Sequence, residues 1–490
     1  MRIIPYFPLS LISYPFPFSL VPFPIPGLGT DQIGRACGRR LAFRDRVTSS
    51  MTVVDTISPE SARHRQVMTR VRRRLIPFAF LCYVVAYIDR VNVGFASAVL
   101  QRDLGLSNTQ FGYGAGLFFI GYCLFEVPSN LILERVGARR WIARILIGWG
   151  IASMGMMFVR DAWSFYAARV VLGIAEAGFF PGVVLYLTYW IPAADRARTG
   201  ALFMMAAPVA IIVGAPISDR LLALNGWFGL HGWQWLFLIE GVPAVVLGVV
   251  ALRVLTDQPR DARWLSDTDR EWLTQRMDAE RERRAETGQT SLARSLRSGR
   301  VWLLCTVYFL NTIVTYGIFL WLPRMLTEAA GGRQSFGLSL MTALPFTAAL
   351  VAMFYVGRHS DRTGERKRHV AACALTAAAG LVLAVMFRGN LWLVVLSFTL
   401  SQVGQRSVQG VFWSIPPIFL GGTAAAASIG LINAIGNLGG FVGPSLMGAL
   451  RDFTGSYTTG LLVLAAALVV EATVVMTLRI PSRDPNATAP

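Results

Sequence analysis

Twelve long apolar segments dominate the sequence, and they constrain the fold more than any other feature. A helix of about 20 apolar residues is long enough to cross the hydrocarbon core of a bilayer. The first six segments lie near residues 75–98, 111–133, 141–159, 163–191, 200–222 and 233–255. The other six lie near residues 301–326, 336–357, 369–388, 391–419, 422–448 and 459–479. The sequence therefore predicts an all-α membrane protein with twelve transmembrane helices.

The composition argues against a soluble protein. Hydrophobic residues make up 54% of the chain and charged residues only 15%, whereas a soluble protein has about 25% charged residues. The net charge of +18 could suggest a nucleic-acid partner. However, the positive residues recur in short clusters between apolar segments, which is typical of the cytoplasmic loops of membrane proteins. We therefore expect a lipid bilayer, and no nucleic acid, around this chain.

The arginine distribution predicts the orientation of these helices. With a cytoplasmic N-terminus, the loops and tails assigned to the cytoplasm hold thirty basic residues, and the loops on the other side hold seven. Cytoplasmic loops carry the excess of Lys and Arg in membrane proteins. We therefore expect both termini in the cytoplasm of a bacterial cell and a multi-pass chain in its inner membrane.

Composition also divides the chain into parts. Residues 5–26 are apolar but carry a proline every few residues, and an interior proline destabilises a helix by about 3 kcal/mol. We expect a disordered extension at residues 1–62, with Met51 as the true start of translation. The other expected parts are a six-helix bundle at 63–255, a cytoplasmic linker with a surface helix at 256–300, a second six-helix bundle at 301–480, and a cytoplasmic tail at 481–490.

The two halves share a loop motif, which indicates duplication of a six-helix unit. Each copy follows the second helix of its half and contains the end of a helix, an acid–arginine pair, a glycine turn and a basic cluster. Internal repeats of this kind typify secondary transporters. We expect the acid of each copy to pair with basic groups of the other half and to hold one gating state. The predicted gating residues are Asn130, Glu134, Arg135, Gly137, Arg139 and Arg140 in the first copy, and Gly357, Asp361, Arg362, Gly364, Arg366 and Lys367 in the second.

The second copy of this motif resembles the loop signature of the major facilitator superfamily. Three further stretches, starting at Tyr87, Phe125 and Trp233, resemble the anion:cation symporter family within it. The segment from Gly430 to Pro444 is most similar to bacterial tartrate, phthalate and hydroxyphenylacetate carriers. The resemblance implies two pseudo-symmetric six-helix bundles. It also implies a monomer that transports a small organic anion by alternating access.

Seven of the ionisable residues inside the predicted helices are our candidates for a function. A charge at mid-bilayer costs at least about 2.5 kcal/mol, so such residues are functional candidates by default. At a rise of 1.5 Å per residue, Asp89, Arg90 and Arg169 lie at one depth in the bilayer. Glu176 lies two turns from Arg169 on the same helix face. They can form a polar path across the first half, or a static network that only holds helices together. The seven residues are Asp89, Arg90, Glu126, Arg169, Glu176, Glu240 and Arg406.

This pattern favours binding of an anion coupled to a proton. A guanidinium group is always charged and binds carboxylates through two parallel hydrogen bonds. When an anionic substrate occupies the arginine, that arginine no longer opposes protonation of a neighbouring buried carboxylate. Anion binding and proton uptake by Asp89 or Glu176 then favour one another, which is symport in outline.

The resemblance assigns roles to individual residues. It implies Asp89 and Glu176 as proton sites, and Arg90 and Arg169 as groups that contact the anion or couple it to the proton. It also implies that Tyr87, Tyr122 and either Asn433 or Asn437 line the substrate site, with Asn433 preferred. Tyr316, Gln405 and Trp413 are candidates for its second half, although ordinary packing explains them equally well. Glu126 and Glu240 lie beside prolines and are expected to join helices.

Other function classes fit the sequence less well. An exporter of drugs or metabolites with the same fold is the main alternative, although only Gly214 to Pro216 matches the fifth helix of such proteins. No HExxH, GxSxG or phosphate-binding GxxxxGK[ST] motif is present, which argues against an enzyme and against transport driven by ATP. The scattered cysteines and histidines show no ligand spacing, so we expect neither a metal nor a cofactor.

Overall fold

The computed structural model describes residues 59–286, 297–332, 335–416 and 422–478. The predictions for residues 1–50, the start at Met51 and the tail at 481–490 lie outside these ranges. The chain divides into a unit of residues 1–64 and a unit of residues 65–490, and the description below concerns the second unit. No strand is present among the described residues, and the all-α prediction is confirmed.

The helices fall into an N-half and a C-half, joined through the linker helix α10 (Asp267–Glu286). The N-half contains α2 (Pro59–Leu104), α3 (Asn108–Val136), α4 (Ala138–Gly155), α5 (Ala162–Glu176), α6 (Phe179–Thr188), α7 (Ala193–Met204), α8 (Ala206–Leu222) and α9 (Gly232–Val254). The C-half contains α12 (Gly299–Phe319), α13 (Leu322–Ala329), α14 (Phe336–Thr363), α15 (Lys367–Met386), α16 (Leu391–Phe412), α18 (Gly422–Thr454) and α19 (Thr458–Thr477).

Each predicted apolar segment coincides with a helix or a helix pair. Eleven of these elements in the described part of the chain are long and apolar enough to cross a membrane. The tenth element, α16, is not among the eleven because its second half carries a run of buried polar side chains. Those side chains are Ser401, Gln402, Gln405, Arg406 and Ser407.

Three of the segments are broken, where the sequence predicts continuous helices. The fourth is divided at Gly178 into α5 and α6, the fifth at Met205 into α7 and α8, and the seventh at Leu320 into α12 and α13. Gly178 has a φ of +84°, which is unfavourable for residues with a side chain. A Cβ atom at this position would also collide with the hydroxyl of Ser129. The break therefore ends α5 directly after Glu176.

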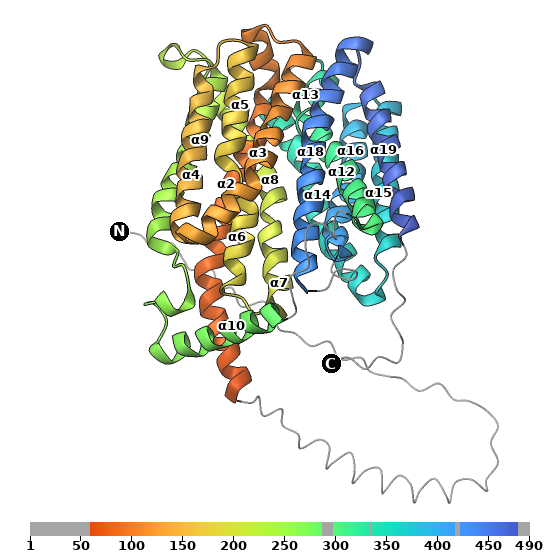
Figure 1. The fold of residues 1–490 in the computed structure, drawn as a ribbon. Helices are drawn as coiled ribbons and strands as arrows, with labels where there is room; N and C mark the ends of the chain where they lie inside the picture. Colours follow the sequence, from red (N-terminus) through yellow and green to blue (C-terminus); the bar gives the residue numbers. More distant parts are fainter. Residues whose placement is uncertain (1–58, 287–296, 333–334, 417–421, 479–490) are drawn as a thin grey trace, which may run out of the picture. The chain divides into compact units, whose positions relative to one another are not determined.

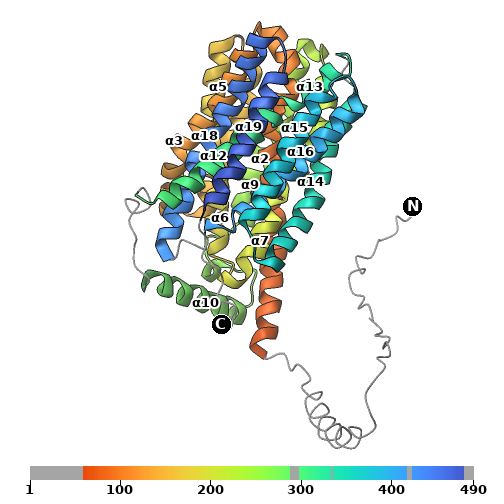
Figure 2. The ribbon, with the colours of Figure 1, turned by 90° about the vertical axis from the view of Figure 1, so that its right-hand side faces the viewer.

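Figure 1 shows the helices of the N-half and the C-half standing side by side, with α10 lying across one end of the bundle. The perpendicular view in Figure 2 places α10 at the same end, next to the lower part of α2 and α7. We call this the α10 end and the other the far end. Ion pairs of Arg70 with Asp269 and of Arg196 with Glu280 hold α10 against α2 and α7.

The two halves meet most closely where α3 packs against α18. A Cβ atom on Gly112 would overlap the carbonyl oxygen of Pro444, and one on Gly116 would lie 2.7 Å from the carbonyl oxygen of Phe441. Small residues allow membrane helices to approach to backbone contact, because apolar surface alone does not drive their association in lipid. The glycines of α3 therefore set the distance between the halves.

We expect Gly112→Ala to destabilise the folded protein by about 1–3 kcal/mol, since the added methyl group cannot fit without moving α18. Gly148→Ala is the matched control, because a Cβ atom there meets nothing within 4 Å. The measurement is the midpoint of thermal unfolding of the two purified variants in detergent. Equal midpoints would show that the α3–α18 contact tolerates a wider spacing.

Candidate functional site

A small cavity lies between the two halves, and side chains of both halves line it. The N-half lines the cavity with Tyr83, Tyr87, Arg90, Phe118, Phe119, Tyr122, Phe180 and Met204. The C-half lines it with Tyr308, Thr312, Thr315, Tyr316, Gln409, Trp413, Asn433 and Asn437. The lining is thus mainly aromatic, with amide and hydroxyl groups supplied by the C-half.

Arg90 of α2 is the one charged side chain in the cavity lining that the structure describes. Its guanidinium carbon lies 5.2–5.3 Å from the ring centroids of Tyr87, Phe118 and Tyr122. Its Nη1 atom donates a hydrogen bond of 3.3 Å to the hydroxyl of Tyr316 in the opposite half. Three aromatic faces and a phenol therefore fix this cation at the boundary between the halves.

Glu176 is the counter-ion of Arg90. The Nη2 atom of Arg90 donates to Oε1 of Glu176, whose side chain is fully buried. The other carboxylate oxygen, Oε2, and the Nε atom of Arg90 are buried without a hydrogen-bond partner. A buried ion pair is stable only while both charges remain together, because either charge alone keeps its full desolvation cost. This pair therefore responds strongly to any anion that competes for Arg90.

Arg169 lies on α5 two turns before Glu176, but it does not line the cavity. Its Nη2 atom donates a 3.1 Å hydrogen bond to the carbonyl oxygen of Ala115, and its guanidinium carbon lies 5.1 Å from the ring centroid of Phe118. Its Nε and Nη1 atoms are buried without a partner. Phe118 thus lies in contact with both arginines, and Arg169 forms a second layer behind it.

Asp89 is also buried, but it faces α4 rather than the cavity. The indole nitrogen of Trp149 donates to one carboxylate oxygen at 2.6 Å, and the hydroxyl of Ser153 donates to the other at 3.0 Å. Asn92 adds a longer bond of 3.4 Å. The expected polar path requires hydrogen bonds between Asp89 and the two arginines. The structure shows Asp89 bonded to Trp149, Ser153 and Asn92. Neutral donors surround this carboxylate instead.

The two remaining glutamates of the N-half join helices, as the sequence predicts. Glu126 on α3 accepts a 2.6 Å hydrogen bond from the side chain of Asn433 on α18, so it links the halves. Glu240 on α9 accepts a 2.8 Å bond from the hydroxyl of Ser218 on α8. One oxygen of each carboxylate is buried without a partner.

The expected residues of the C-half occupy different positions. Tyr316, Trp413, Asn433 and Asn437 line the cavity, so the structure provides both asparagines between which the sequence left a choice. Gln405 does not line it. The Gln405 amide is fully buried and donates to the carbonyl oxygen of Asn311 and to the hydroxyl of a cavity residue, Thr315.

Sequence reasoning missed three of the four α12 residues that line the cavity. Tyr308, Thr312, Thr315 and Tyr316 recur at helical spacing, so the position of Tyr316 alone could have indicated the other three. Gln409 lies one turn beyond Gln405 and could have been found in the same way. The remaining lining residues, Tyr83, Phe118, Phe119, Phe180 and Met204, carry no signal that separates them from ordinary packing residues.

The first loop motif contacts its own half. Gly137, with a φ of +95°, forms the turn between α3 and α4. Arg139 then donates from its backbone nitrogen to Asp257 at 2.8 Å and from its side chain to the carbonyl oxygen of Leu252 at 2.6 Å. Glu134 lies in a surface depression together with Arg196 and Arg281. Asn130 bonds back to the carbonyl oxygen of Glu126.

The second motif is likewise closed on itself, so the expected pairing across the halves is not formed in this state. Asp361 forms a 2.6 Å ion pair with Arg366 of the same loop. Gly364 makes the turn with a φ of +68°, and Lys367 donates to the carbonyl oxygen of Leu478 at the end of α19. Because Gly364 brings these two side chains together, the acid is already neutralised within its own half in this state.

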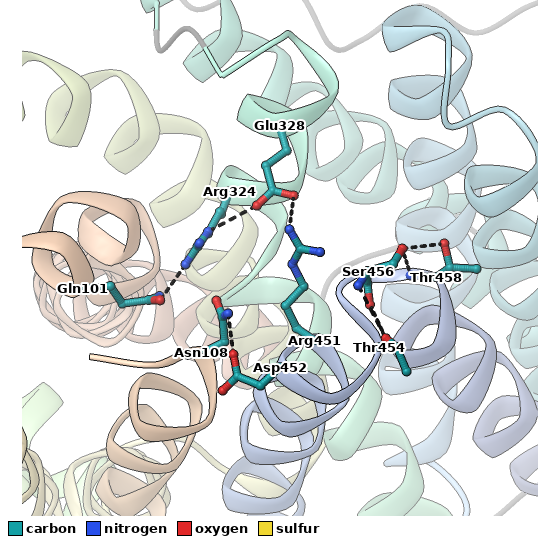
Figure 3. A network of polar contacts seen from close by, with 9 residues as sticks. All are labelled: Gln101, Asn108, Arg324, Glu328, Arg451, Asp452, Thr454, Ser456 and Thr458. Atoms are coloured by element: carbon teal, nitrogen blue, oxygen red, sulfur yellow. Dashed lines mark hydrogen bonds and ion pairs between the residues drawn. The ribbon is translucent and has the colours of Figure 1, made fainter. Parts of the chain in front are cut away.

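Polar contacts close the two halves at the far end, as shown in Figure 3. The carboxylate of Asp452 on α18 accepts hydrogen bonds from the backbone nitrogens of Asn108 and Thr109 at 3.2 and 2.7 Å, and from both side chains at 2.7 and 2.6 Å. Arg324 on α13 donates to the amide oxygen of Gln101 on α2 at 2.6 Å. We call these five residues the far-end latch.

Comparison with known proteins gives consistent results. The family model described as Major Facilitator Superfamily matches residues 79–444, with a further match at 332–489. A protein of Agrobacterium vitis described as "Putative tartrate transporter" is 48% identical over 413 residues, covering 84% of this chain and 94% of that protein. A "Quinolone resistance transporter" of Acinetobacter baumannii is 38% identical over 410 residues, covering 82% and 93%.

Solved structures share the fold at low sequence identity. The inward-open structure of the xylose transporter XylE from E. coli superimposes with a TM-score of 0.68 at 14% identity, covering 84% of this chain and 97% of that one. The arrangement of two six-helix halves is therefore that of a known transporter fold.

Proposed function

The chain belongs to the major facilitator superfamily, and from this premise we propose that it takes up a small organic carboxylate together with protons. The observation that carries the proposal is the Arg90–Glu176 pair at the edge of the cavity between the halves. A single buried cation that three aromatic rings hold in place offers an anionic substrate one strong point of attachment. The tartrate-transporter relative supports a carboxylate as the anion.

Competition for Arg90 couples the anion to the proton. A substrate carboxylate that binds Arg90 displaces Glu176, and a carboxylate left unpaired in a low-dielectric interior takes up a proton. Asp89, which only neutral donors surround, provides a second proton site next to Arg90 in the sequence. Arg169 contacts Phe118, one of the rings that hold Arg90, and so keeps the anion site in place. Anion and proton thus enter together, and the cycle requires no cofactor or metal.

The arginine asymmetry supports placement in the bacterial inner membrane, with the α10 end and both termini in the cytoplasm. The far-end latch then faces outward and is closed in this state. As the family resemblance implies, we propose that a monomer is the working unit, with the cavity between its two halves.

The experiment is uptake by the purified protein in liposomes. Labelled tartrate, phthalate, hydroxyphenylacetate and galactonate are offered with and without an inward proton gradient, and Asp89→Asn and Arg169→Ala are measured beside the wild type. We expect the gradient to drive accumulation of at least one acid. Asp89→Asn should retain exchange of that acid between the two sides but lose accumulation, because an amide cannot carry a proton. Arg169→Ala should lower both the exchange and the accumulation of that acid. If the wild type transports none of the four acids, the proposal is wrong.

Export of a drug or metabolite in exchange for protons is the second candidate. The observation in its favour is the 38% identical relative named as a quinolone resistance transporter. The same liposomes separate the two functions. Export predicts that a proton gradient moves an aromatic drug against the proton flow, and that the four acids neither move nor compete.

A further inference from the structure

The C-half buries a cation for which nothing above assigns a role. Arg406 lies on α16, and its side chain is only 3% exposed. Its Nη1 atom makes one long hydrogen bond of 3.5 Å to the amide oxygen of Gln409, and its Nε atom is buried without a partner. In the described part of the chain, no carboxylate lies within ion-pair distance of this guanidinium.

This guanidinium lies directly behind the cavity wall. Gln409, its hydrogen-bond partner, lines the cavity. Its carbon is 5.5 Å from the ring centroid of Phe319 and 5.6 Å from that of Phe346, and Phe319 packs edge-on against Tyr316 of the lining. Tyr87 of the opposite half also lies within electrostatic range of Arg406. The guanidinium is thus linked to the cavity lining directly through Gln409, and to Tyr316 through Phe319.

A buried cation without a counter-ion keeps most of its desolvation cost, which amounts to several kcal/mol. Contact with the two phenylalanine rings stabilises the cation by about 0.5–2 kcal/mol each, which offsets only part of this desolvation cost. Arg90 in the other half, by contrast, has Glu176 as its partner in this state. The cavity is thus flanked by one paired guanidinium in the N-half and one unpaired guanidinium in the C-half.

We propose that Arg406 is the second anion anchor, and that the substrate of this transporter carries two carboxylates. This inference rests on the proposed function. One carboxylate binds Arg90, and the other neutralises Arg406 at the Gln409 side of the cavity. A dianion that spans the cavity attracts both halves, so it stabilises the closed state between the outward-facing and inward-facing arrangements. A monocarboxylate leaves Arg406 unpaired and gains nothing from the C-half.

The test compares ligands that differ in one charge. Tartrate and its monomethyl ester share a carbon skeleton, as do phthalate and its monomethyl ester. Dissociation constants are measured by calorimetry on purified full-length protein, for the wild type, Arg406→Gln, Arg406→Lys and Ser407→Ala. Ser407 is the control because it is the buried neighbour of Arg406, and its hydroxyl also lacks a partner.

For at least one of the two diacid–monoester pairs, we expect the wild type to bind the diacid about ten- to a hundredfold more tightly than the monoester. This factor corresponds to the free energy that one hydrogen bond to a charged group contributes. Arg406→Gln should weaken diacid binding by that factor and leave monoester binding unchanged. Arg406→Lys should keep part of the preference, and Ser407→Ala all of it. Without ligand, Arg406→Gln should unfold at an equal or higher temperature than the wild type, because it removes an uncompensated charge.

Three outcomes overturn the inference. Equal weakening of diacid and monoester by Arg406→Gln indicates a purely structural role, as does a lower unfolding temperature without ligand. An unchanged preference in Arg406→Gln shows that the second carboxylate binds elsewhere. If Arg406→Gln does not fold, the test rests on Arg406→Lys. A reduced preference for the diacid with unchanged monoester binding then supports the anchor, and equal weakening of both ligands rejects it. Failure of the wild type to bind any of the four ligands rejects the proposed function itself.

Discussion

Arg90→Gln is expected to lower uptake at least a hundredfold, the largest effect of any single substitution in this chain. The substitution removes the one charged group among the described residues of the cavity lining and leaves Glu176 buried without its partner. Breaking a buried pair in this way costs about 3–5 kcal/mol. The variant should therefore lose both substrate binding and folding stability, which are measured by calorimetry and by thermal unfolding in detergent.

The double variant Arg90→Gln/Glu176→Gln separates these two losses. Removing both charges removes the unpaired carboxylate, so stability should return to within about 1 kcal/mol of the wild type. Binding should remain absent, because no cation is left at the cavity. A double variant that binds the acid at wild-type strength would falsify the role of Arg90 as the anion site.

Glu176→Gln alone should act in the opposite direction on binding. The substrate then no longer competes with a carboxylate for Arg90, so the anion should bind at least as tightly as in the wild type. Accumulation driven by the proton gradient should fall toward simple equilibration, since the amide cannot be protonated. Loss of binding in this variant would mean that Glu176 positions Arg90 and does not compete with the substrate.

Asp452→Ala is expected to open the far end of the bundle. The Asp452 carboxylate accepts four hydrogen bonds from the first turn of α3, where the helix leaves backbone N–H groups unpaired and the helix dipole favours a negative charge. Hydrogen bonds to a charged group contribute about 1.5–3 kcal/mol each. Loss of even about 3 kcal/mol shifts the ratio of closed to open far ends by about a hundredfold.

Distances between spin labels at the far end test this directly. Labels at Arg102 of α2 and Phe453 of α18 are both exposed and lie on different halves. Pulsed electron paramagnetic resonance should show a second, longer distance between the labels in Asp452→Ala. In Asp452→Asn, a smaller fraction of molecules should show this longer distance. This measurement does not depend on which end faces outward.

Asp161→Ala is the matched control for the latch. Asp161 also caps a helix at the far end, by accepting a 2.8 Å hydrogen bond from the backbone nitrogen of Ser164. Unlike Asp452, it caps a helix of its own half, α5. This bond, together with that from the Ser164 hydroxyl, holds the pKa of Asp161 below its ordinary value. Its loss should leave the distance between the halves unchanged, because this cap lies within the N-half. A single distance population in both variants would mean that glycine packing, and not the latch, closes this end.

The number and order of the membrane helices followed from the sequence, because each helix must bury its own backbone groups in lipid. That requirement acts locally, so hydrophobic length alone predicts it. The duplicated loop motif likewise predicted two equivalent halves. The break after Glu176 did not follow, because it depends on the left-handed backbone of Gly178 and on its contact with Ser129 of another helix.

The candidate site was predictable as a set of residues but not as a geometry. Asp89 and Arg90 are neighbours in sequence, and successive residues of a helix point about 100° apart. Arg90 therefore reaches the cavity, while Asp89 bonds to Trp149 of α4. The same rule places Gln409 in the lining and Gln405 behind Thr315.

Local hydrophobicity was thus enough to predict twelve membrane-spanning segments and the charged residues within them. Which of these charges meet could be seen in the folded chain alone. The fold pairs Arg90 with Glu176, 86 positions away, and Asp361 with Arg366 of its own loop, and among the described residues it places no carboxylate in an ion pair with Arg406. The physical reason is that a charge in a low-dielectric interior is governed by the few groups within hydrogen-bond reach, and helix packing alone selects those groups.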